Sequence, residues 1–169
     1  MWGRGVSCPS CASYYIARCP KLQAKGKRML LKMHHTGFVV SDIDVAARFY
    51  EEVIGLNPLP RRERDGSAIS QILGYEGTHI KIAEFTHGEY MLELIEYVHP
   101  PGSDAHVHER NAFGASHIAF VVDDIDAAYE RLIANGARKL NPPIEIVDGK
   151  KGCYLQDPDG NWVELLEMG

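Results

Sequence analysis

Long hydrophobic runs are absent from this 169-residue sequence. None of its apolar stretches approaches the roughly 20 residues that a helix needs to cross a bilayer, so we expect no membrane span. Beyond residue 28 there is only one cysteine, Cys153, which excludes a disulfide framework in the main body and suits a cytoplasmic location. Apolar residues nevertheless make up 45% of the chain, enough for one domain with a substantial core.

Acidic residues are missing from positions 1–28, which carry only basic charges (Arg4, Arg18, Lys21, Lys25, Lys27 and Arg28). Since the whole chain has a net charge of −5, the remainder carries −11. An acidic body argues against a nucleic-acid partner. We expect residues 1–28 to be a disordered basic extension, with a transit peptide or a start codon placed too early as alternatives.

Two further clusters have the residue types of metal sites but lack a full ligand set. Cys8-Pro-Ser-Cys11 has the spacing of a zinc knuckle, yet no second pair completes a tetrahedral site. His99, His106 and His108 lie in a linker rich in proline and glycine, where we interpret them as solvated side chains. Neither cluster predicts a metal centre.

One pattern of twelve residues occurs twice in the chain. His35–Ala46 and His117–Ala128 share a histidine, a phenylalanine, Val-Val, Asp-Ile-Asp and a final alanine, at an offset of 82 positions. Glu93-Leu-Ile-Glu96 and Glu164-Leu-Leu-Glu167 form a second echo at an offset of 71. The chain is therefore built from two similar halves.

Hydrophobic periodicity gives both halves the same order of elements. In the first half it predicts a strand over 30–40, a helix over 43–54 and strands over 68–73, 79–85 and 90–98. In the second half it predicts a strand over 115–122, a helix over 125–133 and strands over 144–147, 152–156 and 162–166. We expect an α+β fold in which residues 29–169 form one domain. Its two tandem β-α-β-β-β modules (33–98 and 115–168) would form a curved mixed sheet around a metal cleft, with helices outside.

Four potential metal ligands occupy repeat-equivalent positions: His35, Glu93, His117 and Glu164. A small residue stands two places after each histidine on the same strand face, which leaves room for a ligand. If the halves pack with pseudo-symmetry, each His/Glu pair points into one cavity, where two imidazoles and two carboxylates suit a single divalent ion (Zn, Ni, Co, Mn or Fe). Duplication of a purely structural pattern is the alternative, although a buried carboxylate without a cation is costly.

Glu96 and Glu167, three residues beyond the candidate ligands, fall on the other strand phase. We expect them to be surface charges at the strand ends. Lys150 and Lys151 are similarly expected to be solvated.

These motifs resemble the vicinal oxygen chelate superfamily of glyoxalase, bleomycin-resistance and dioxygenase-like proteins. The resemblance covers about residues 33–168 and rests on four stretches: His35-x-Gly-Phe-x-Val-x-Asp, Leu92-Glu93-Leu94, His117-Ile-Ala-Phe-x-Val-Asp-Asp and Asp157–Leu165. It implies that His35, Glu93, His117 and Glu164 are the metal ligands. A His/Glu/His/Glu ligand set is similar to that of the branch that contains glyoxalase I and methylmalonyl-CoA epimerase.

The resemblance also implies a reaction. A divalent-metal-dependent lyase or isomerase of this type moves a proton α to a carbonyl through a metal-bound enediolate, with Glu164 and Glu93 as the catalytic carboxylates. Its substrate would be a thiol adduct, an acyl-CoA or another carbonyl compound, and the protein would be a homodimer. A metal-dependent dioxygenase or a non-catalytic, drug-resistance type of binding protein are the alternatives. The substrate, the metal and the completion of the site within one chain or across a dimer stay open.

Overall fold

The computed structural model describes residues 30–103 and 109–169. The chain divides into two units, residues 1–33 and 34–169, and the fold below is that of the second. The basic extension, its cysteine pair, His106 and His108 all lie outside the described residues.

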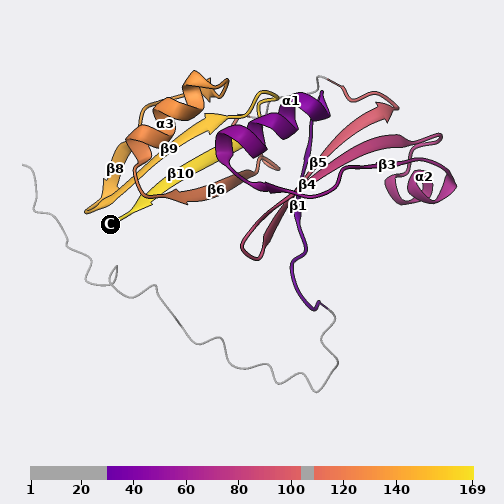
Figure 1. Ribbon diagram of the computed structural model, residues 1–169, viewed down its shortest axis with the longest axis horizontal. Coiled ribbons are helices and arrows are strands. Elements are labelled where there is room, and N and C mark those ends of the chain that lie inside the picture. Colours follow the sequence, from indigo (N-terminus) through magenta and orange to yellow (C-terminus); the bar gives the residue numbers. More distant parts are fainter. Residues whose placement is uncertain (1–29, 104–108) are drawn as a thin grey trace, which may run out of the picture. The chain divides into compact units, whose positions relative to one another are not determined.

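The second unit contains two mixed sheets of five strands each (Figure 1). The elements of module one are β1 (Thr36–Val39), α1 (Ile43–Arg48), the π-helical turn η1 (Phe49–Ile54), β2 (Asn57–Pro58), β3 (Arg62–Arg64), α2 (Ser67–Leu73), β4 (His79–His87) and β5 (Tyr90–His99). Those of module two are β6 (His117–Val122), α3 (Ile125–Ala134), β7 (Arg138–Lys139), β8 (Ile144–Val147), β9 (Lys150–Gln156) and β10 (Trp162–Met168). The α+β class with two repeated modules is confirmed.

The two sheets have the same topology. The strand order is β1-β5-β4-β2 in one and β6-β10-β9-β7 in the other, with β3 and β8 paired to β4 and β9. In each module the first strand runs parallel to the last. This pairing lays the repeated histidine segment directly beside the repeated glutamate segment. No helix in the described ranges is long and apolar enough to cross a membrane.

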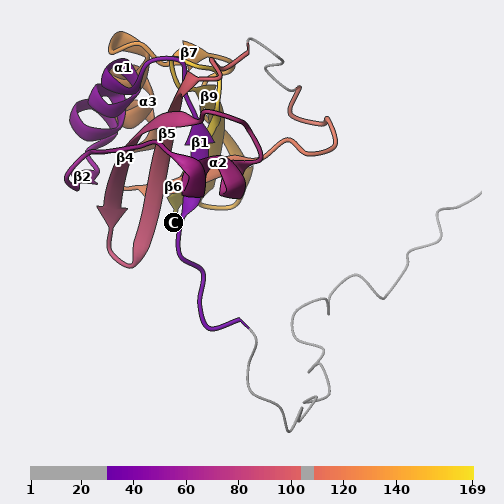
Figure 2. The ribbon, with the colours of Figure 1, turned by 90° about the vertical axis from the view of Figure 1, so that its right-hand side faces the viewer.

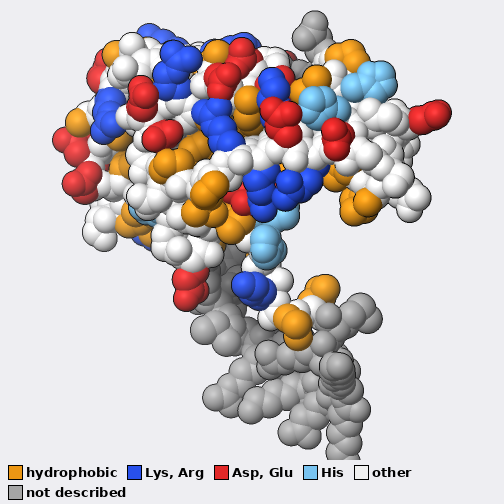
Figure 3. Space-filling view, turned by 45° about the vertical axis from the view of Figure 1, so that its right-hand side comes forward, with side chains coloured by type: hydrophobic (Ala, Val, Ile, Leu, Met, Phe, Trp, Pro, Cys, Tyr) orange, Lys and Arg blue, Asp and Glu red, His pale blue; other side chains and the backbone are white. Residues whose placement is uncertain are grey.

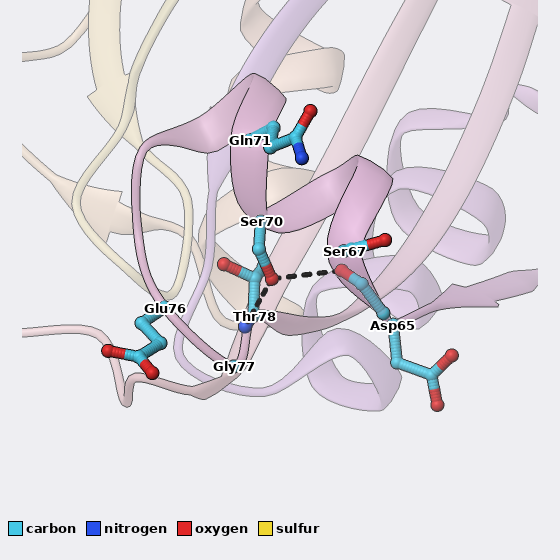
Figure 4. Close-up of a pocket in the computed structure, with 8 residues that line it drawn as sticks. Asp65, Ser67, Ser70, Gln71, Glu76, Gly77 and Thr78 are labelled. Atoms are coloured by element: carbon cyan, nitrogen blue, oxygen red, sulfur yellow. Dashed lines mark hydrogen bonds between the residues drawn. The ribbon is translucent and has the colours of Figure 1, made fainter.

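One prediction about module one is wrong: residues 68–73 belong to helix α2 rather than to a strand. Ile69, Ile72 and Leu73 recur at helical spacing, and Gly74 ends the helix in the left-handed conformation (φ 77°). Ser70 Oγ donates to the Gly66 carbonyl and accepts from the Thr78 amide (Figure 4). The serine thereby fixes the helix to the loop before β4, and the short β3 takes the place of the expected strand.

A single hydrophobic core joins the helices to one face of each sheet. It is formed by α1, η1, α3 and alternate strand residues such as Phe38, Leu94, Leu155 and Val163. Helices α1 and α3 lie near each other in both ribbon views (Figures 1 and 2). The opposite face of each sheet carries the candidate ligands, as the period-two alternation predicts.

A buried polar contact connects the two modules inside this core. Tyr50 Oη donates to Asp157 Oδ2 over 2.9 Å, and the amides of Asp159 and Asn161 donate to Asp157 Oδ1. Burial raises the pKa of Asp157, while the donors from Asn161 and Tyr50 oppose that shift. The carboxylate is fully buried, so these hydrogen bonds offset its desolvation.

Glu96 and Glu167 are not the free surface charges that we expected. Glu96 Oε2 accepts from the amide of Ile43, and Glu167 Oε2 accepts from the amide of Ile125, each over 2.8 Å. Each carboxylate therefore satisfies the first turn of a helix and complements the positive end of its dipole. Acidic and basic side chains otherwise lie interspersed on the face shown in Figure 3.

Candidate metal centre

Each module brings its histidine and its glutamate together. His35 Nε2 lies 3.3 Å from Glu93 Oε1, and His117 Nε2 lies 3.2 Å from Glu164 Oε2. Two ligands held about 2.1 Å from one ion lie about 3.0 Å apart at right angles and about 3.4 Å apart at a tetrahedral angle. Both pairs therefore already have the separation of two donors that share one ion.

The strand register explains this geometry. Glu93 is directly opposite Gly37, and Glu164 is directly opposite Ala119, the small residues two places after each histidine. A Cβ atom on Gly37 would lie 4.0 Å from Glu93 Oε1, so this carboxylate rests over the glycine. The predicted pairing of each histidine with the glutamate of its own module is confirmed. Only the start of β1 differs, because His35 stands immediately before that strand.

The two pairs do not combine into one ligand set in a single chain. Over residues 30–103 and 109–169, no three His, Cys, Asp or Glu side chains are close enough to hold one ion. Both histidines keep substantial side-chain exposure, 38% for His35 and 46% for His117, while the carboxylates are mostly covered. Each module thus presents a His/Glu pair whose histidine is exposed.

Module one surrounds its pair with further charged groups. Glu84 on β4 is directly opposite Glu93 and forms an ion pair with Arg62 on β3. On the other side of the histidine, His34 Nδ1 lies 2.7 Å from His35 Nδ1. The contact with His34 leaves His35 Nε2 directed at Glu93.

Module two has different neighbours at the equivalent places. Tyr154 on β9 is directly opposite Glu164, and its ring stands edge-on to His117 at 5.3 Å between centroids. The guanidinium of Arg110 lies over the rings of Tyr154 and Trp162. Burial raises the pKa of the Tyr154 phenol, the Glu164 carboxylate raises it further, and Arg110 opposes the shift.

A groove of about 1100 Å³ is lined by residues of both modules. Ser116 and Trp162 of module two line it together with Tyr75 and Tyr97 of module one, whereas His117 and Glu164 do not line it. The two tyrosine rings stand edge-on, 6.2 Å apart. The groove provides space for the organic part of a small molecule.

These neighbours of the two pairs were not predicted from the sequence. Strand alternation could have placed Glu84 and Tyr154 on the ligand faces once β4 and β9 had been aligned with the last strands. No strand alternation predicts the position of Arg110, because this residue lies in the connection before β6. It contacts the rings of Tyr154 and Trp162 through tertiary packing.

The described fold is a duplicated β-α-β-β-β architecture with one exposed histidine beside a glutamate in each module. The sequence profile of the Glyoxalase/Bleomycin resistance protein/Dioxygenase superfamily matches residues 32–165. The chain belongs to this superfamily, as the motifs around His35 and His117 implied.

Named relatives include enzymes. A 2-epi-5-epi-valiolone epimerase from Actinomyces sp is 32% identical over 145 residues, which is 80% of this chain and 79% of the relative. Lactoylglutathione lyase from Haemophilus influenzae is 31% identical over 139 residues, 81% of this chain and 93% of the relative. A glyoxalase family protein from Bacillus cereus has a similar structure, with a TM-score of 0.78 and 31% identity, covering 86% of this chain and 99% of that one.

Proposed function

We propose that this protein is a divalent-metal-dependent lyase or isomerase that moves a proton on the carbon next to a carbonyl group. The observation that carries the proposal is the ligand-like separation, 3.3 and 3.2 Å, within two repeat-equivalent His/Glu pairs. An epimerase and a lactoylglutathione lyase among the relatives support this class of reaction.

We also propose that the site is completed by a second copy of the chain. One chain supplies two pairs, each with two donors and an exposed histidine, and no larger cluster exists among the described residues. A two-fold dimer that sets module one of one copy against module two of the other would build two equivalent sites with four donors each. His35, Glu93, His117 and Glu164 would then hold one divalent ion, such as Zn, Ni, Co, Mn or Fe.

The roles of the side chains follow from the chemistry of the pairs. A bound ion supplies Lewis acidity toward the substrate's carbonyl oxygens. Glu164 accepts the proton from the substrate carbon next to the carbonyl group. Once that carbon is planar, Glu93 offers a carboxylate on its other side, as epimerisation requires. His34 holds His35 by its Nδ1 atom, so the other ring nitrogen keeps its direction.

Glu164→Gln tests the assignment of the base. We expect the variant to fold, to keep at least part of its metal, and to lose solvent proton exchange in a screen of methylglyoxal–thiol adducts and acyl-CoA epimers in heavy water, followed by nuclear magnetic resonance. Glu145→Gln, an exposed carboxylate on β8, is the matched control and should exchange like wild type. Full exchange by the Glu164 variant would contradict the assignment, and absence of bound metal in wild type would contradict the metal site.

A further inference from the structure

Arg110 is placed on the ligand face of module two, the sheet face that bears His117 and Glu164. Its guanidinium carbon lies 5.1 Å from the centroid of the Tyr154 ring and 5.4 Å from that of Trp162. The register puts Trp162 opposite His117 and Tyr154 opposite Glu164. The arginine is therefore fixed beside this His/Glu pair by the two aromatic side chains that flank it.

Within the described residues, the contacts of Arg110 are with aromatic rings, which hold its charge in place without neutralising it. Aromatic faces attract a guanidinium through their quadrupole and carry no counter-charge. None of the ion pairs found in the described parts of the chain includes Arg110. Arg62, the arginine on the ligand face of module one, is by contrast paired with Glu84. Of these two arginines, Arg110 is thus the one without a carboxylate partner among the described residues.

The guanidinium of Arg110 carries five N–H donors, and the aromatic rings accept no more than weak contacts from them. These donors form a fork that matches the paired oxygens of a carboxylate or a phosphate. The surrounding surface makes such a cation unusual, because residues 29–169 carry a net charge of −11.

We propose that Arg110 binds an anionic oxygen group of the substrate, a carboxylate or a phosphate, while the substrate's carbonyl end lies at the His/Glu ligands. This inference rests on the proposed function and deepens it, because it makes the substrate an acidic carbonyl compound. Tyr154 and Trp162 act as positioning residues, since their rings set the place of the guanidinium.

The test uses zinc-loaded full-length protein and three hydroxamates that share a metal-chelating end. Acetohydroxamate is the probe without an anionic group, succinic monohydroxamate adds a carboxylate, and phosphonoacetohydroxamate adds a phosphonate. Calorimetry gives the dissociation constant of each. We expect wild type to bind at least one of the two anionic probes about tenfold or more tightly than acetohydroxamate, and the better one identifies the anionic group.

Arg110→Gln should reduce that preference to about twofold or less and leave the affinity for acetohydroxamate unchanged. Arg48→Gln, an equal change of charge on the exposed side of helix α1, should keep the wild-type preference. If Arg110→Gln kept the full preference for the anionic hydroxamate, or if wild type showed no such preference, the inference about Arg110 would be overturned while the proposed function would stand. If wild type bound zinc and none of the three hydroxamates, or bound no zinc, the proposed function would fall and the inference with it.

Discussion

A complementation experiment tests whether two copies build each metal site. His35→Ala removes a ligand from module one, and His117→Ala removes one from module two. In a two-fold dimer whose sites each combine module one of one copy with module two of the other, either variant alone damages both sites. A mixed dimer with one chain of each variant concentrates both lesions in one site and leaves the other site intact.

The geometry sets the expected amount of metal. Wild type should hold about two ions per dimer, each single variant close to none, and the mixed dimer about one. The loss in each single variant should be severe, because three donors replace four and the remaining carboxylates lose their counter-charge. Co-expression with two different affinity tags isolates the mixed dimer, and elemental analysis counts its zinc.

A matched control separates true complementation from partial binding by damaged sites. The control is a mixed dimer in which one chain carries His35→Ala and the other carries Glu93→Ala. Both lesions then lie in module one, so each of the two sites has one damaged module and the zinc content should stay near zero. If the mixed dimer of His35→Ala and His117→Ala contained no zinc while wild type prepared in the same way was fully loaded, assembly of the site across two copies would be refuted. The ligands would then have to meet within one chain.

Two predictions concern the contacts behind the His/Glu pairs. Tyr50→Phe removes the hydroxyl that donates to buried Asp157, so the free energy of unfolding in urea should fall by about 1.5–3 kcal/mol with zinc content unchanged; a wild-type stability would show that the contact contributes nothing. Glu167→Ala removes the acceptor of the Ile125 amide and should cost about 1–2 kcal/mol. Glu167→Gln keeps an acceptor without charge and should cost less, and equal losses in both variants would contradict a role for the charge.

The pairing of each histidine with its glutamate could be predicted from sequence because two simple regularities act together. Period-two alternation fixes which strand residues share a face, and the duplication shows that His35 and Glu93 are equivalent to His117 and Glu164. The small residues Gly37 and Ala119 then mark where each carboxylate lies. The pattern within one module was sufficient here, because each pair belongs to the first and last strands of a single module.

Other features depend on contacts that no local pattern encodes. Helix α2 was predicted as a strand because its short apolar stretch suits both structures, and the Ser70 contacts that support the helix come from the loop before β4. Glu96 and Glu167 meet helices that lie far from them in sequence. Strand alternation places Glu96 and Glu167 on the sheet face opposite to Glu93 and Glu164. It does not predict which backbone amide each carboxylate accepts a hydrogen bond from.

The two His/Glu pairs are alike in their residues and unlike in their surroundings. At the place where module one has Glu84, paired with Arg62, module two has Tyr154 beneath Arg110. Duplication preserved the groups suited to hold an ion, whereas the residues next to them diverged. A substrate that binds in the proposed site would meet a neutralised ion pair on one side and an unneutralised cation with two aromatic rings on the other. If the proposed site forms, this asymmetry would give an acidic substrate one favoured orientation relative to Glu93 and Glu164, with its anionic group toward Arg110.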